Sequence, residues 1–279
     1  MVAYDLEVIN IWEGYILVDQ EILRKAQLKM VDILIEIDKI CVKHDIKYWL
    51  CYGTLLGAVR HGGFIPWDDD CDICMMRDDY EKFVEVAHNE LPNYLLLQSK
   101  EIDPNYPKSM TKVRMKDTKL VEFDESENEK YHQGIFVDIF IWDYHHPLAI
   151  SVMKNIEFIK SWKESRKKYH KGSLRRILIQ VTVILPYILY SLIMKMIYFS
   201  STFYRKNKNL NIIGQDVDAC DMKFYNPQNI FPIKKNITFE NRLFFVPNDV
   251  DTVLYKKYGN YMVLPPLENR HWHAKRIDL

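Results

Sequence analysis

The residues best suited to chemistry are aspartates that follow a glycine–hydroxyl turn. The turn Gly53-Thr54 is followed in the sequence by Trp67-Asp68-Asp69-Asp70-Cys71-Asp72. The stretch from 70 to 75 predicts a strand, in which residues two apart point to the same face. Asp70 and Asp72 then project together, and their repulsion would raise their pKa values unless a cation lay between them. A hard divalent cation with oxygen ligands, Mg²⁺ or Mn²⁺, fits this pair.

A third aspartate lies in a later apolar stretch. Asp138 interrupts Phe136-Val137-Asp138-Ile139-Phe140, where an unpaired charge would be costly in a buried strand. We expect a neighbouring strand to bring Asp138 beside the first two aspartates, so that all three bind the metal and carry the catalysis. In the alternative interpretation, these acids cap turns or pair with Arg60 and Arg114.

Groups that bind phosphate are also present. Gly53-Thr54 is predicted to lie where a strand meets a helix, so its backbone amides can face an anion at the helix amino terminus. Arg60, Arg114 and Lys112 are candidate contacts for the phosphates of a donor, because an arginine fork suits phosphate oxygens. The same cations could instead pair with the aspartates, and both interpretations stay open.

Two further patterns carry less weight. Cys71 and Cys74 have CxxC spacing, but on a strand they point to opposite faces and no second ligand pair lies nearby, which favours packing. His271 and His273 could reach the site from the tail, although a surface histidine is more common than a catalytic one. We therefore leave these four residues out of the predicted site.

The elements that must position these side chains follow from hydrophobic periodicity. A helix capped by Asp19 precedes a short strand at 46–51, and a second helix runs from Gly53-Thr54 to a break at His61-Gly62-Gly63. The remaining segments predict strands at 95–97, 112–115, 119–123 and 135–141, a hairpin at 237–246 and a helix after Pro247. The pattern predicts an α+β fold with a mixed β-sheet flanked by helices.

The composition limits the classes of function. Of the 279 residues 48% are hydrophobic, which allows a sizeable core, and 38 basic residues balance 38 acidic ones. Because the net charge is zero, nothing global steers the chain toward nucleic acid, and we expect no such partner. The amino terminus shows no signal-peptide pattern, and five cysteines form no disulfide framework, so we expect a cytoplasmic protein.

The middle of the chain differs in character. Residues 177–194 carry no charge, and basic clusters lie on both sides of them. Pro186 interrupts this stretch, which favours a buried or interfacial helix pair over a membrane span. We therefore expect a catalytic core at 1–145, a largely helical insertion at 146–210, and a part at 211–279 that packs back on the core. Residues 172–208 would give peripheral contact with the inner face of the cell membrane.

Taken together, these residues resemble the LicD/fukutin family. The resemblance is dense from about 46 to 79 and poor from 143 to 210. It rests on Tyr52-Gly53-Thr54-Leu55-Leu56-Gly57-Ala58-Val59-Arg60-His61, Gly63-Phe64-Ile65-Pro66-Trp67-Asp68-Asp69-Asp70, Asp72-Ile73, Phe136-Val137-Asp138-Ile139-Phe140, Tyr258-Gly259-Asn260-Tyr261, Leu264-Pro265-Pro266, Arg270 and His273.

The resemblance implies a nucleotidyltransferase fold and a metal-dependent phosphotransferase. Such an enzyme moves phosphocholine or ribitol phosphate from a CDP-linked donor to a sugar hydroxyl of a glycan or of its lipid-linked precursor, and CMP leaves. Among such donors we expect CDP-choline. The resemblance also implies that Asp70 and Asp72 bind the metal and that Asp138 is the third acid. Two alternatives stay open: a nucleotidyltransferase that releases pyrophosphate, and a catalytically silent membrane-associated scaffold.

Overall fold

A computed structural model describes residues 19–147 except 109, residues 150, 189, 192, 193 and 196, residues 210–215, and residues 223–279 except 271. Its first element is the long helix α1 (Gln20–Lys43). The side chain of Asp19 accepts a hydrogen bond of 2.8 Å from the backbone N–H of Glu21, which confirms the predicted cap. Buried residues recur every three or four positions along α1, so one stripe faces the core.

The central sheet is mixed, as predicted. Its strands follow the order β1 (Tyr48–Leu50), β2 (Asp72–Met76), β6 (Phe136–Tyr144), β4 (Thr111–Met115) and β3 (Leu95–Gln98). β2 and β6 are parallel, whereas every other pair in this order is antiparallel. The far end of β6 pairs antiparallel with β7 (Ile213–Gln215), which in turn pairs with β8 (Phe224–Tyr225).

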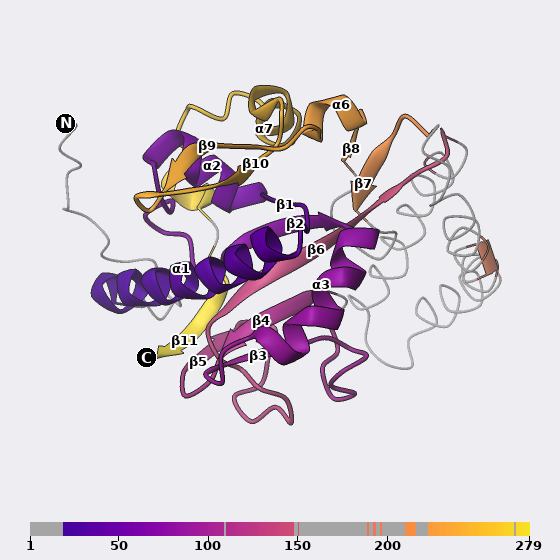
Figure 1. The fold of residues 1–279 in the computed structure, drawn as a ribbon. Coiled ribbons are helices and arrows are strands. Elements are labelled where there is room, and N and C mark those ends of the chain that lie inside the picture. Colours follow the sequence, from indigo (N-terminus) through magenta and orange to yellow (C-terminus); the bar gives the residue numbers. More distant parts are fainter. Residues whose placement is uncertain are drawn as a thin grey trace, which may run out of the picture.

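Helices flank this sheet, and Figure 1 shows α1 and α3 (Arg77–Glu90) lying across it on the viewer's side. α1 contacts β4 and β6, and α3 contacts β2, β3 and β6. The strands beneath them are almost fully buried, so the core lies between these helices and the sheet.

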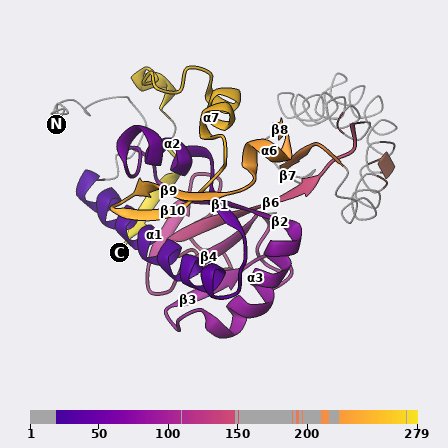
Figure 2. The same cartoon turned by 45° about the horizontal axis from the view of Figure 1, so that its top comes forward.

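Residues 227–258 build one end of the molecule around the short helix α2 (Tyr52–His61). After α6 (Pro227–Ile230), the hairpin of β9 (Lys234–Phe239) and β10 (Arg242–Val246) packs on α2, and α7 (Val250–Tyr258) follows. Figure 2 shows α2, α7 and the hairpin gathered on the same side of the sheet. The chain then passes η2 (Leu267–Asn269) and ends in β11 (Ala274–Asp278), which pairs with β5 (Lys119–Glu122).

Several boundaries differ from the prediction by one to three residues, among them the starts of two elements. The second strand begins at Asp72 instead of residue 70, and the hairpin begins at Lys234 instead of residue 237. Asp70 therefore lies in the loop that leads into β2, where the alternation of strand side chains does not apply. In this loop the side chain of Asp69 accepts hydrogen bonds from the backbone N–H groups of His273 and Ala274.

The predicted insertion falls almost entirely outside the described residues, and so does most of the segment 172–208. The division into 1–145, 146–210 and 211–279 therefore stays a prediction. Within the described part of the chain, no helix combines the length and the apolar character needed to cross a membrane. Four cysteines in this part, at 41, 51, 71 and 74, are buried free thiols.

Candidate active site

Asp72 and Asp138 lie side by side on the two parallel strands. They are Cα partners in the register of β2 and β6, and each is only 6% exposed. The backbone N–H of Asp138 donates a hydrogen bond of 2.8 Å to the carbonyl of Cys71, which fixes this register at the start of β2. A neighbouring strand thus brings the later aspartate to the earlier ones, although their catalytic and metal-binding roles stay predictions.

Asp70 and Asp68 approach the same place from the loop before β2. Burial raises the pKa of Asp70 to about 6, with Asp69 and Asp138 adding to the rise and His273 and Lys112 opposing it. Burial followed by neighbouring carboxylates also raises the pKa of Asp72 and of Asp68 well above the usual range. Four carboxylates therefore share one low-dielectric region in which their negative charges repel one another.

Lys112 on β4 contacts Asp138 on the neighbouring strand β6. Its Nζ atom is fully buried, lies 3.0 Å from both carboxylate oxygens and sits 3.1 Å from the ring centroid of Phe136. Burial raises the pKa of Asp138, and Lys112 partly offsets that rise. This geometry favours a structural pairing of Lys112 with Asp138 over a contact with the donor phosphates.

The two arginines of the predicted site are also engaged within the protein. Arg114 is fully buried and donates to the carbonyl of Gly134 at 2.7 Å and to Gln98. Arg60, near the end of α2, donates to the carbonyl of Tyr261 at 3.0 Å. The positive charge of Arg114 also lowers the pKa of Asp138, against the rise that burial causes. Assignment of these arginines to phosphate stays a prediction, and the burial of Arg114 favours a structural role for it.

The Gly53-Thr54 turn forms the amino-terminal end of α2, beside the carboxylates. The Oγ1 atom of Thr54 accepts a buried hydrogen bond of 2.7 Å from the backbone N–H of Asp72, so this hydroxyl positions β2. A Cβ atom at Gly53 would lie 2.7 Å from Oδ2 of Asp68, which explains why this position has no side chain. The amides of the first helical turn have no partner inside the helix and remain suited to an anion.

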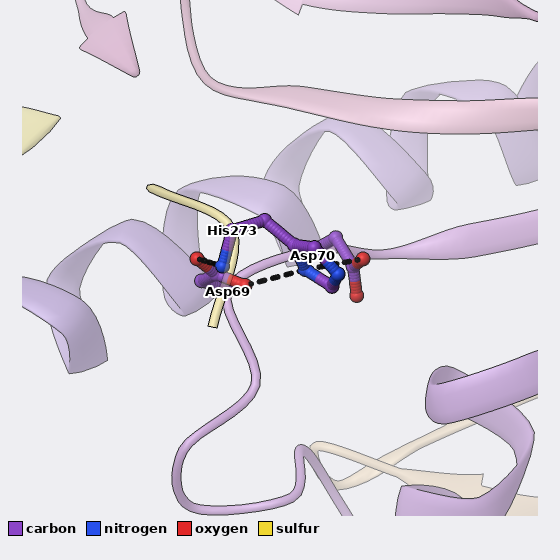
Figure 3. A group of neighbouring side chains, drawn as sticks. All are labelled: Asp69, Asp70 and His273. Carbon is purple, nitrogen blue, oxygen red and sulfur yellow. Dashed lines mark hydrogen bonds and ion pairs between the residues drawn. The ribbon is translucent and has the colours of Figure 1, made fainter. Parts of the chain in front are cut away.

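His273 contacts Asp69 and Asp70 in the loop before β2, although neither His273 nor Asp69 is part of the predicted site. Figure 3 shows the imidazole of His273 between Asp69 and Asp70. The Nδ1 atom lies 3.1 Å from Oδ1 of Asp69 and 3.4 Å from Oδ2 of Asp70. The hydrogen bond to Asp69 raises the pKa of His273 to about 9, although burial opposes that rise. The pattern that resembles the family ends at His273, which is the feature of the sequence that pointed to this residue. The sequence did not show that β11 pairs with β5, which brings His273 to the aspartates. His271 lies outside the described residues.

The acids fit a divalent cation on two counts. Among the residues that the structure describes, the buried Oδ2 atom of Asp68 accepts no hydrogen bond, and the Oδ1 atom of Asp138 has the Lys112 ammonium 3.0 Å away but no hydrogen bond of good geometry. The raised pKa values show that the cluster is unfavourable as a set of bare anions. Carboxylate oxygens with open lone pairs are the ligands that Mg²⁺ and Mn²⁺ prefer.

Comparisons with known proteins identify the family of this chain. A family model described as LicD/FKTN/FKRP, nucleotidyltransferase domain, matches residues 45–186. The lipopolysaccharide cholinephosphotransferase LicD of Haemophilus influenzae is 31% identical over 258 residues, which cover 90% of this chain and 95% of that protein. The ribitol 5-phosphate transferase FKRP of mouse and human is 53% identical over 34 residues, 12% of this chain and 7% of those proteins. The chain therefore belongs to the LicD/FKTN/FKRP family.

Proposed function

We propose that this protein transfers a phosphorylated alcohol, of the phosphocholine kind, from a CDP-linked donor to a sugar hydroxyl. The acceptor is a cell-surface glycan or its lipid-linked precursor, and CMP is the second product. The observation that carries the proposal is the similarity to a lipopolysaccharide cholinephosphotransferase over nearly the whole of both chains. The paired aspartates of β2 and β6 add a physical reason, because such chemistry requires neutralisation of a diphosphate.

In this proposal Asp70, Asp72 and Asp138 hold one or more divalent cations, Mg²⁺ or Mn²⁺. A bound cation supplies charge neutralisation for the donor diphosphate and for the charge that develops during transfer. Lys112 favours the ionised form of Asp138 and orients its carboxylate. The backbone amides of Gly53 and Thr54 orient the donor phosphates at the amino-terminal end of α2.

The reaction is an in-line displacement at phosphorus. The acceptor hydroxyl oxygen forms a bond to the β-phosphorus, which carries the alcohol, and the bond from that phosphorus to the bridging oxygen breaks. CMP leaves with the bridging oxygen and its electron pair. Asp138, whose carboxylate also pairs with Lys112, accepts the proton of the hydroxyl.

A donor panel tests this proposal. The purified protein is incubated with Mg²⁺, methyl glycosides as model acceptors, and CDP-choline, CDP-ribitol or CTP. We expect CMP to be released from one CDP-alcohol and the phosphorylated alcohol to appear on the glycoside. Pyrophosphate release from CTP would instead identify a nucleotidyltransferase. If neither product forms from any donor, with the natural glycan included as acceptor, the catalytic proposal fails and the scaffold interpretation gains support.

A further inference from the structure

Asp69 fastens the carboxy-terminal segment to the loop of catalytic aspartates. Its side chain is 1% exposed, and its Oδ2 atom accepts hydrogen bonds from the backbone N–H groups of His273, at 2.8 Å, and of Ala274. The partners lie 204 and 205 residues further along the chain. The next residues form β11, whose pairing with β5 holds the segment from its other side.

This attachment sets the position of the His273 imidazole. Once the backbone of His273 is held by Asp69, its Nδ1 atom faces Oδ1 of Asp69 at 3.1 Å and Oδ2 of Asp70 at 3.4 Å. Asp70 is thereby contacted on one side by a ring that the protein scaffold holds in place (Figure 3). A free carboxylate in a loop has several rotamers, and fixing one of them reduces the entropy lost when it binds an ion.

Asp69, Asp70 and His273 each offer one ligand atom, and these atoms lie within 4.8 Å of one another. A cation among these three would displace the hydrogen bonds that Asp69 makes to His273 and Ala274, which hold the end of the chain in place. The contacts therefore describe a support for Asp70 rather than a second cation site.

We propose that Asp69 and His273 are positioning residues that orient Asp70 for the divalent cation. This inference rests on the proposed function. It adds that residues near the carboxy terminus set the affinity for the cation of a loop more than two hundred residues earlier in the sequence. Groups that orient a metal ligand from outside the coordination sphere commonly change metal affinity by roughly 10–100-fold.

The test is direct titration of the purified full chain with Mn²⁺, followed by the electron paramagnetic resonance of free Mn²⁺. His273→Ala and Asp69→Ala should each raise the dissociation constant by roughly tenfold or more. The double variant should bind Mn²⁺ almost as well as the single variant with the higher dissociation constant, because the two residues act as one unit. His88→Ala, at an exposed position on α3, serves as the matched control and should bind like the wild type.

Two conservative variants separate positioning from simple packing. An asparagine at 273 keeps an amide near the position of Nδ1, whereas a glutamine places its amide near Nε2. We expect His273→Asn to bind Mn²⁺ within about threefold of the wild type and His273→Gln to resemble His273→Ala. The reverse order, or wild-type affinity in His273→Ala, overturns the inference. If the wild type itself fails to bind Mn²⁺, the cation site in the proposed function is wrong, and this inference is wrong with it.

Discussion

At the scale of single residues, the buried ion pair between Lys112 and Asp138 bears most directly on the role of this lysine. Lys112 is enclosed by the sheet and also lies 3.5 Å from Glu122, so one ammonium faces two carboxylates. The sequence left open whether this lysine binds phosphate or an aspartate, because both roles need only a positive charge. The answer depends on the antiparallel register of β4 and β6, in which Lys112 and Asp138 are Cα partners.

We expect Lys112→Met to lower the free energy of unfolding by roughly 3–5 kcal/mol, because it leaves a buried carboxylate without its partner. Urea denaturation followed by circular dichroism measures this loss. Combining Lys112→Met with Asp138→Asn should recover part of the stability, since the unpaired charge is gone.

The matched control is Lys130→Met, at an exposed position in the acidic loop (residues 124–132) that follows β5, and it should change stability by less than about 0.5 kcal/mol. A Lys112→Met protein as stable as the wild type would contradict the structural pairing. Lys112 would then be free to serve a ligand.

At the scale of elements, α2 packs closely against the loop that follows it, and glycines stand at the points of closest approach. The amino-terminal end of α2 approaches Asp68 so closely that a Cβ at Gly53 would meet its Oδ2 at 2.7 Å. Near the middle of the same helix, a Cβ at Gly57 would meet the backbone oxygen of Gly63 at 2.5 Å. The first neighbour is the end of a side chain that can move, whereas the second is backbone that cannot move without a shift of the loop.

These two glycines predict different outcomes for the same substitution. Gly53→Ala should displace the Asp68 carboxylate and lower the rate of CMP release by roughly 10²-fold, with a change in unfolding free energy below about 1 kcal/mol. Gly57→Ala should instead cost roughly 1–3 kcal/mol of stability, because overpacking falls on the backbone. Equal effects of the two variants on stability, with full activity in Gly53→Ala, would show that the position of Asp68 is unimportant.

The elements also show what the sequence could predict. Local patterns located α1 with its Asp19 cap, most of the sheet strands and the β9–β10 hairpin, because periodicity and turn residues are local signals. The placement of Asp138 beside the earlier aspartates followed from the cost of a lone buried charge. Asp69 and His273 could not be found in this way, since their contact depends on the pairing of β11 with β5 across most of the chain.

At the scale of the whole molecule, charged groups link β4, β5 and the acidic loop that follows. Lys108 lies 2.6 Å from Glu122 and 3.2 Å from Asp124, and Lys112 approaches Glu122 from inside the sheet. Burial alone would raise the pKa of Glu122, but Lys112 and Lys108 hold it at about 2. Glu122 also belongs to β5, the strand that carries the carboxy-terminal β11.

This depressed pKa predicts a loss of stability in acid. The carboxylate of Glu122 stabilises the folded state fully above its unfolded pKa of about 4.5, and the contribution disappears as the pH falls toward 2. The two pKa values differ by an amount worth on the order of 3 kcal/mol. Urea denaturation at pH 6 and pH 3 measures the change. Glu122→Gln should be less stable at pH 6 and show a shallower decline between the two pH values. An identical slope in this variant would contradict the pairing.

The central claim is that the aspartates joined by β2 and β6 carry out transfer from a CDP-alcohol, and one measurement tests it most directly. The rate of CMP release from the preferred CDP-alcohol is compared for the wild type, Asp72→Asn and Asp78→Asn, at saturating Mg²⁺. Asp78 is an exposed carboxylate at the start of α3 and serves as the matched control. We expect Asp78→Asn to retain the wild-type rate and Asp72→Asn to lose at least roughly 10²-fold, while both variants remain folded. CMP release by Asp72→Asn within twofold of the wild type would contradict the account.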